Sequence, residues 1–176
     1  EVLVDGQFGY FAINNISYES IEYAAKQAYN QALYASKYTI HSFNESVRPK
    51  SVGTYESPYK IKDIPLDHLM DVLLKSNKKL KESSKIVSAI SMARLVDMKM
   101  KFVSSNGSDF SQNFMYVGPG YRAIAQDGSI VQSRSYMDQC QQAGMEVFEE
   151  NRVLNKCENI CREAVELLTA EECPTD

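Results

Sequence analysis

The sequence predicts an α+β fold: a hairpin–helix subdomain followed by a helix, an antiparallel β-meander and a C-terminal helix. Three observations predict it. Apolar and polar side chains alternate over residues 98–102, as in a half-buried strand. Other stretches carry apolar residues at helical spacing. Short apolar runs are separated by dipeptides that favour hairpin turns, namely Asp5-Gly6, Asn106-Gly107 and Asp127-Gly128.

Residues 1–45 form the first predicted subdomain. Its hairpin turns at Asp5-Gly6 and returns over residues 8–13, where Gly9 marks either a bulge or a close approach of another backbone. Ser17 is a favourable N-cap for a helix over residues 18–36. Because the chain starts inside a strand, we expect earlier strands of this subdomain to be missing. An apolar stripe on the helix would pack on the hairpin, and its members are Ile21, Ala25, Ala28, Ala32 and Ala35.

A connector separates this part from the rest of the chain. Residues 37–65 contain three prolines and little periodicity, and loops of that length are uncommon within one compact domain. We therefore expect a linker over residues 46–64, with a short strand near residues 43–47. The second subdomain then covers residues 65–176.

The second subdomain opens with a helix from Pro65 to about residue 82. A strand over residues 85–96 leads into the meander, which ends at residue 136 and which Gly118-Pro119-Gly120 interrupts. We expect the helix to lie across the meander with Leu73 fully buried. The apolar face of this helix comprises Leu66, Leu69, Met70, Leu73, Leu74 and Leu80.

The C-terminal part begins with an irregular or strand-containing excursion over residues 137–154. A final helix over residues 154–169 follows and ends before Cys173-Pro174. The residues that this helix is expected to bury are Cys157, Cys161, Ala164, Val165 and Leu168.

Composition excludes several classes of protein. The chain has 176 residues, of which 44% are hydrophobic and 24% charged, as in a globular protein. Its formal net charge of −4 and the lack of a basic block argue against nucleic-acid binding. No apolar run approaches the ~18 residues of a membrane span. Four cysteines without C-x-x-C spacing are consistent with reduced thiols and a cytoplasmic protein.

Some residues could form a metal or acid–base site. Cys157 and Cys161 are four apart on one helix face, which fits half of a metal site or, more commonly, two buried apolar residues. His41 and His68 have no ligands at suitable spacing. A carboxylate cluster is possible, although solvated charge is the commoner explanation, at Glu146, Glu149 and Glu150.

Three further patterns could be functional but have simpler structural explanations. Gly118-Pro119-Gly120 could cradle a phosphate but favours a turn, and residues 104–108 could hold a nucleophile but favour turn chemistry. Four aromatic residues could form a stacking platform, although we expect helices to cover them: Phe110, Phe114, Tyr116 and Tyr121. We therefore predict no catalytic, cofactor-binding or metal-binding residue, and no cofactor, within this chain.

Three stretches, in this order, resemble the N-terminal region of the TldD/PmbA family, whose members are known as modulators of DNA gyrase. Residues 1–28 resemble the family's passage from hairpin to helix through V-DG and TN-LS-E patterns. Residues 101–128 resemble a strand with an SS-G-S turn, and residues 146–174 resemble a closing helix with an A--cP ending. The SSNGS turn and the AEECP ending favour the TldD side of the family.

The resemblance implies a function that lies mostly outside this chain. TldD proteins are zinc metallopeptidases, PmbA is similar in fold but lacks the metal, and the zinc-binding histidine motif lies beyond the position equivalent to residue 176. The chain would be a non-catalytic N-terminal portion, supplying contacts for a homodimer or a TldD–PmbA-type heterodimer and walls of a chamber for unfolded peptide. The alternative is a free-standing, non-enzymatic protein-interaction domain.

Overall fold

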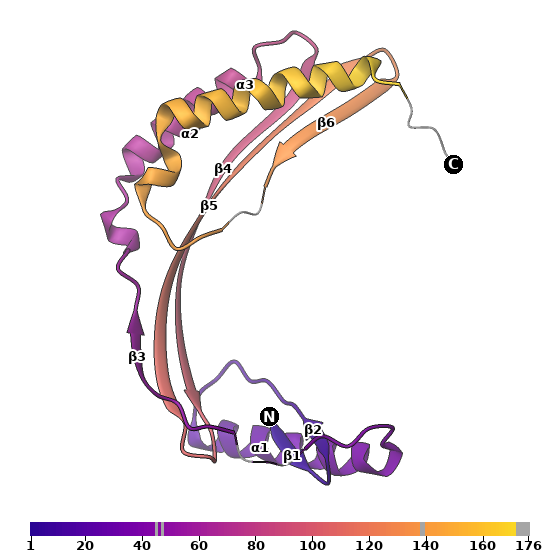
Figure 1. The fold of residues 1–176 in the computed structure, drawn as a ribbon, viewed down its shortest axis with the longest axis vertical. Helices are drawn as coiled ribbons and strands as arrows, with labels where there is room; N and C mark the ends of the chain where they lie inside the picture. Colours follow the sequence, from indigo (N-terminus) through magenta and orange to yellow (C-terminus); the bar gives the residue numbers. More distant parts are fainter. Residues whose placement is uncertain (45, 47, 138–139, 172–176) are drawn as a thin grey trace. The chain divides into compact units, whose positions relative to one another are not determined.

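The structure is a computed structural model that describes residues 1–44, 46, 48–137 and 140–171 (Figure 1). Helices and strands are both abundant, which confirms the α+β class. The chain divides into two compact units, Glu1–Lys50 and Ser51–Asp176. No helix in the described ranges combines the length and apolar character that crossing a membrane requires.

The first unit contains the predicted hairpin and helix. Strands β1 (Val2–Val4) and β2 (Gln7–Gly9) pair antiparallel around Asp5 and Gly6, whose φ angles of 48° and 73° fit a type I′ turn. The return strand ends at Gly9, earlier than predicted. Helix α1 (Tyr18–Ala35) begins where predicted, because the Ser17 side chain accepts a hydrogen bond from the Ser20 amide, and η1 (Ser36–Tyr38) follows it.

Gly9 determines how the helix meets the hairpin. A Cβ atom at this position would lie 1.7 Å from the Ala28 carbonyl oxygen, so the close-approach explanation of this glycine is the correct one. Ala28 and Ala32 are buried at the contact. The predicted stripe was too wide, because Ile21, Ala25 and Ala35 are exposed.

The predicted connector contains regular structure. Strand β3 (Val52–Glu56) and the short helix η2 (Ile61–Asp63) both lie within it, and β3 pairs in parallel with β5. The strand expected near residues 43–47 is absent at Phe43, Asn44 and Ser46, and residues 45 and 47 lie outside the described residues.

The second unit is built on one long hairpin. Strands β4 (Ile86–Val103) and β5 (Asp109–Asp127) pair over almost their whole length, and β6 (Ile130–Tyr136) pairs antiparallel with the second half of β5. The break predicted at Gly118-Pro119-Gly120 was wrong, because these residues lie inside β5, opposite residues 92–94.

Pro119 is tolerated inside β5 because the backbone N–H that proline lacks would point away from β4. Val117 exchanges two hydrogen bonds with Gln141, so odd-numbered residues of β5 turn their polar backbone groups away from β4. Pro119 belongs to this set and lies between the Gln141 bridge and the first β6 pair, at Tyr121, where no described strand requires its missing N–H. The flanking glycines permit close packing, since a Cβ at Gly118 would lie 2.5 Å from the Cys140 sulfur.

The two predicted meander turns exist, with different geometry. In the first loop the Gly107 amide donates to the Ser104 carbonyl, and Gly107 has a φ of 85° whereas Asn106 is not at positive φ. This arrangement fits a three-residue loop with a bulged glycine, in place of a type I′ turn. In the second loop Gly128 alone has positive φ, 58°, which fits a type II′ turn at Gly128-Ser129.

Helices α2 (Leu66–Leu80) and α3 (Glu150–Glu166) lie on the same side of the sheet, and β4 and β5 continue beyond them (Figure 1). The predicted bounds of α2 are nearly correct, but its buried face is rotated. Leu73 is half-buried, contrary to the prediction. Ser76 is fully buried, and its hydroxyl hydrogen-bonds the Leu73 carbonyl and the Ser91 hydroxyl. The buried residues of α2 are Leu69, Val72, Ser76 and Leu80, whereas Leu66, Met70 and Leu74 are exposed.

Helix α3 begins four residues earlier than predicted. The Glu149 carboxylate accepts hydrogen bonds from the amides of Asn151 and Arg152 and so caps the helix. Glutamate is an unusual N-cap, and residues 137–154 were predicted to be irregular or to contain a strand, so this start was not predicted. The short helix η3 (Met145–Phe148) precedes α3, and η4 (Leu167–Thr169) follows it. Of the residues expected to be buried, Val165 is half-buried, and Cys157, Cys161, Ala164 and Leu168 are buried.

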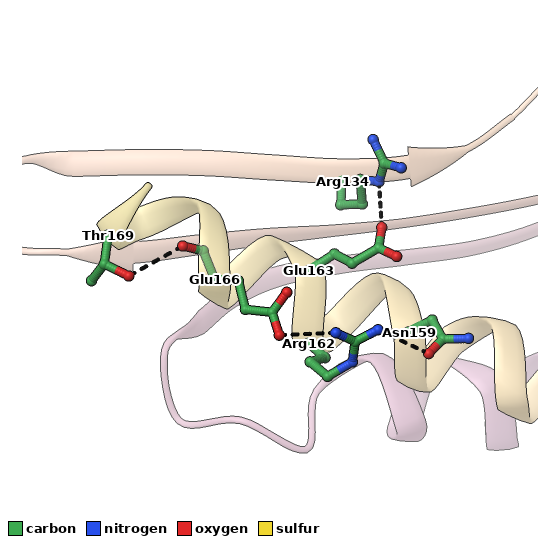
Figure 2. A network of polar contacts seen from close by, with 6 residues as sticks. All are labelled: Arg134, Asn159, Arg162, Glu163, Glu166 and Thr169. Atoms are coloured by element: carbon green, nitrogen blue, oxygen red, sulfur yellow. Dashed lines mark hydrogen bonds and ion pairs between the residues drawn. The ribbon is translucent and has the colours of Figure 1, made fainter. Parts of the chain in front are cut away.

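Ion pairs connect α3 to the sheet and also form between neighbouring side chains on α3. Figure 2 shows Arg134 of β6 reaching the Glu163 carboxylate of α3, with Nε and oxygen 2.6 Å apart. Arg162 pairs with Glu166 one turn later on the same helix, at 2.9 Å. Both pairs are largely solvent-exposed, so each contributes little to the free energy of unfolding. The Arg134–Glu163 pair joins β6 to α3, whereas the Arg162–Glu166 pair lies within α3.

Candidate functional site

The cysteine pair lies in the hydrophobic core. Cys157 and Cys161 are buried between the helices and the sheet, in agreement with the buried-residue interpretation. Burial raises the pKa of the Cys157 thiol to about 12. A thiol with so high a pKa stays protonated near neutral pH and is a poor nucleophile.

The histidines and the acidic residues have separate structural surroundings. The His41 ring packs edge-on against Phe43, with centroids 5.4 Å apart, and His68 is exposed on α2. Glu146 accepts a hydrogen bond from the Gly144 amide, which lowers the pKa of its carboxyl group. Glu149 caps α3 and Glu150 pairs with Lys75. Within the part of the chain that the structure describes, no three His, Cys, Asp or Glu side chains could together hold a metal ion.

The feature that most resembles a binding surface is the part of the long hairpin beyond the helices. We call residues 96–103 of β4 and 109–116 of β5 the distal ribbon. Met98, Met100 and Phe102 remain 41%, 41% and 44% exposed. The Phe102 and Phe110 rings stack with centroids 4.9 Å apart. The even-numbered apolar residues, with Tyr55 of β3, form an aromatic–methionine face: Tyr55, Met98, Met100, Phe102, Phe110, Phe114 and Tyr116.

Helices α2 and α3 of the second unit do not cover this face. Tyr121, which is odd-numbered, points to the helix side and is 1% exposed, as expected. Phe110, Phe114 and Tyr116 lie on the opposite face and are half-buried, so the expectation was wrong for them. In one continuous strand, even- and odd-numbered side chains point to opposite faces, so the numbering alone would have separated these three residues from Tyr121. The predicted break at residues 118–120 placed Tyr121 on a different strand, and the comparison was lost.

The other face of the distal ribbon is mainly polar, apart from Val103 and the buried Met115. Lys99 and Lys101 of β4 lie opposite Asn113 and Ser111 of β5, and Lys101 forms an ion pair with Asp109. The ribbon is therefore amphipathic. A partly exposed apolar face beside polar residues is typical of a surface that binds another chain, and methionine side chains adapt to varied partners.

The backbone of β4 also offers an open edge. The Gln126 amide donates to the Lys85 carbonyl, so even-numbered residues of β5 bond to β4. In the distal ribbon, these even-numbered residues of β5 lie opposite even-numbered residues of β4, which bond back to β5. The odd-numbered residues of β4, among them Lys99 and Lys101, therefore turn their N–H and C=O groups away from β5, toward the open edge. No strand within the described ranges pairs with this edge. It can therefore bind an extended chain through backbone hydrogen bonds.

Comparison with known proteins identifies the family. The family model of the PmbA/TldA metallopeptidase central domain matches residues 59–170. A search of curated proteins found no match.

Two solved structures share the fold. One is a proposed modulator of a DNA gyrase from Thermotoga maritima, with a TM-score of 0.58 and 17% identity over 98% of this chain and 37% of that chain. The other is TldE from Thermococcus kodakarensis, with a TM-score of 0.53 and 20% identity over 93% of this chain and 35% of that chain. This chain thus spans little more than a third of either structure. Because the family match covers more than half of its residues, the chain belongs to the PmbA/TldD family.

Proposed function

We propose that the chain is a non-catalytic portion of a TldD-like zinc metallopeptidase that acts on unfolded peptides. In this proposal, zinc is held by another part of the full-length protein, and this chain supplies subunit contacts and walls of the substrate chamber. The match to a metallopeptidase central domain supports it. The partial coverage of both similar structures is consistent with it.

The observation that carries the proposal is the distal ribbon. An unfolded peptide offers unpaired backbone groups along its whole length, and the open edge of β4 offers the complementary groups. Alternate side chains of a peptide added there would extend the aromatic–methionine face. Because backbone pairing is independent of side-chain identity, such a surface accepts many sequences, as an enzyme for unfolded substrates requires.

Peptide binding by the ribbon can be measured directly. A fluorescein-labelled peptide of alternating valine and threonine is titrated with the chain, and fluorescence anisotropy reports the affinity. Lys99→Pro removes an outward N–H at an edge where proline is tolerated, and should weaken binding roughly five-fold, the equivalent of one hydrogen bond. Lys99→Ala removes only the charge and should bind like the wild type. Equal affinities of the two variants would contradict binding at this edge.

The enzymatic part requires the full-length protein. Hydrolysis of an unfolded peptide that a chelator abolishes and zinc restores would support the metallopeptidase proposal. Phe102→Ser should raise KM with little change in kcat, because the ribbon binds substrate without touching the reacting atoms. Peptide binding without any hydrolysis would favour the alternative, a protein-interaction domain that uses the same ribbon.

A further inference from the structure

A pocket beside the first half of α3 has features of a binding site that neither the family match nor the ribbon explains. It holds about 90 Å³ and lies between α3, the middle of β5 and the end of β6. That volume exceeds the ~10–15 Å³ that a single water requires. Its apolar wall is formed by Pro119, Val147 and Val153, and its polar wall includes Tyr121, Arg152 and Lys156.

The two cations on the polar wall have no acidic partner. Arg152 and Lys156 are one helical turn apart, hence on one face of α3. Neither pairs with a carboxylate in the described part of the chain, whereas cations on neighbouring surfaces do: Lys75, Lys79, Arg134 and Arg162. The Lys156 ammonium lies over the Tyr136 ring, 3.2 Å from its centroid, which offsets part of its charge. The guanidinium of Arg152 is the cation left for a ligand.

Tyr121 supplies a second, independent observation. Tyr121 lines the pocket and is 1% exposed, and its buried hydroxyl has no hydrogen-bond partner among the residues that the structure describes. A buried hydroxyl without a partner is costly, so a ligand that accepts its proton would gain from the contact. Burial raises the pKa of this phenol, which therefore remains a donor throughout the physiological range.

We propose that this pocket binds a small carboxylic acid through Arg152, with Tyr121 as a second donor and the apolar wall around the acid's substituent. A guanidinium matches the planar carboxylate by two parallel hydrogen bonds. One guanidinium and one neutral phenol suit a single negative charge better than a phosphate dianion. The carboxylate could belong to a free acid or to the C-terminus of a peptide, and the inference is independent of peptide binding by the ribbon.

The test follows backbone amide shifts by NMR while the chain is titrated with N-acetyl-L-alanine. Saturable shifts near residues 119–121 and 152–156 are expected, and N-acetyl-L-alaninamide, which lacks the charge, should cause none. Arg152→Gln should weaken binding at least five-fold. Arg162→Gln, on the same helix but paired with Glu166, should leave the affinity unchanged. Equal shifts with the amide, no saturation, or no effect of Arg152→Gln would overturn the proposal.

Tyr121→Phe separates a ligand contact from a structural role. It should weaken binding of N-acetyl-L-alanine several-fold while leaving the melting temperature of the free chain unchanged or higher, because no protein partner loses a hydrogen bond. A lower melting temperature with unchanged affinity would show that the hydroxyl serves the fold, through a bound water, and would overturn its assigned role. Acetate and trialanine identify the source of the carboxylate by their relative affinities. Tighter binding of inorganic phosphate than of either would overturn the carboxylate assignment.

Discussion

Gly9 and Gly107 show that two glycines in similar turn-rich segments can be required for different reasons. At Gly9 the neighbouring backbone leaves no room, since a Cβ would lie 1.7 Å from the Ala28 carbonyl oxygen. At Gly107 the requirement is conformational, because its φ of 85° is strained for residues with a side chain. The sequence predicted a special role for both positions, but only the structure distinguishes steric from conformational need.

Gly107→Val should destabilise the second unit by about 1–3 kcal/mol, because a β-branched residue is strained at positive φ. Ser105→Val is the matched control, since it places the same side chain in the same loop at a residue without positive φ. It should change the free energy of unfolding by no more than about 0.5 kcal/mol. Urea unfolding followed by circular dichroism measures both, and identical midpoints would mean that the loop relaxes without cost.

Cys157 should make stability depend on pH at alkaline values. Its pKa is raised by burial from 9.0 to about 12, so the folded state retains a proton that the unfolded state releases above pH 9. The stabilisation is fully present below pH 9 and is lost as pH rises toward 12. Cys157→Ala should therefore flatten the fall of the urea midpoint between pH 9 and pH 10.5. Parallel curves for the variant and the wild type would show that this thiol does not titrate differently in the two states.

At the scale of elements, helical spacing predicted the bounds of α2 but not its orientation. Apolar residues occur around much of this helix, so several stripes fit the pattern equally well, and Val72 and Ser76 face the core where Leu66, Met70 and Leu74 were expected. The buried serine could not be foreseen, because its partner Ser91 is on another element. The spacing of apolar residues predicts where a helix begins and ends, whereas the face that it buries depends on tertiary contacts.

Two leucines of α2 test this orientation. Leu80 is fully buried and Leu74 is 66% exposed. Leu80→Ala removes transfer free energy and leaves a cavity, and should cost about 2–5 kcal/mol. Leu74→Ala makes the same chemical change on the outer face and should cost no more than about 0.5 kcal/mol. Equal losses of thermal stability in the two variants would mean that the helix packs with the face originally predicted from the sequence.

The strands show the opposite pattern of success. Alternation over residues 98–102 correctly predicted strand structure, yet Met98, Met100 and Phe102 are substantially exposed. Alternation of apolar and polar residues indicates that a strand has one apolar and one polar face. It does not indicate whether a helix or another sheet covers the apolar face. The candidate binding ribbon was therefore present in the sequence as a pattern, and only the extent of the helices identified it as uncovered.

At the scale of the whole molecule, the family was recognisable from sequence because three weak patterns occur in the right order, and the central-domain match confirms it. The pocket beside α3 was not recognisable. Tyr121 is distant in sequence from Arg152 and Lys156, and the three form no known motif. The predicted start of α3 was also too late to put Arg152 on a helix. Sites assembled from separate elements require the register of those elements, which single-sequence patterns do not provide.

The two units differ in how much apolar surface they bury. Apart from Ala28 and Ala32, every buried hydrophobic residue that the structure describes belongs to the second unit. A segment of about fifty residues normally needs a substantial core, a disulfide or a partner to fold alone. We therefore expect the fragment of residues 51–176 to fold without the first unit, and the fragment of residues 1–50 to be unfolded in isolation.

Expression of each fragment checks this expectation. Residues 51–176 should show a cooperative melting transition within a few degrees of that of the full chain, together with dispersed amide resonances. Residues 1–50 should show the circular dichroism of an unfolded chain, because the contact of α1 with its hairpin buries little besides two alanines. If the larger fragment loses its cooperative transition, or if the smaller one melts cooperatively, stability is distributed differently from buried apolar area. The first unit would then owe its fold to interactions other than the core that the structure describes.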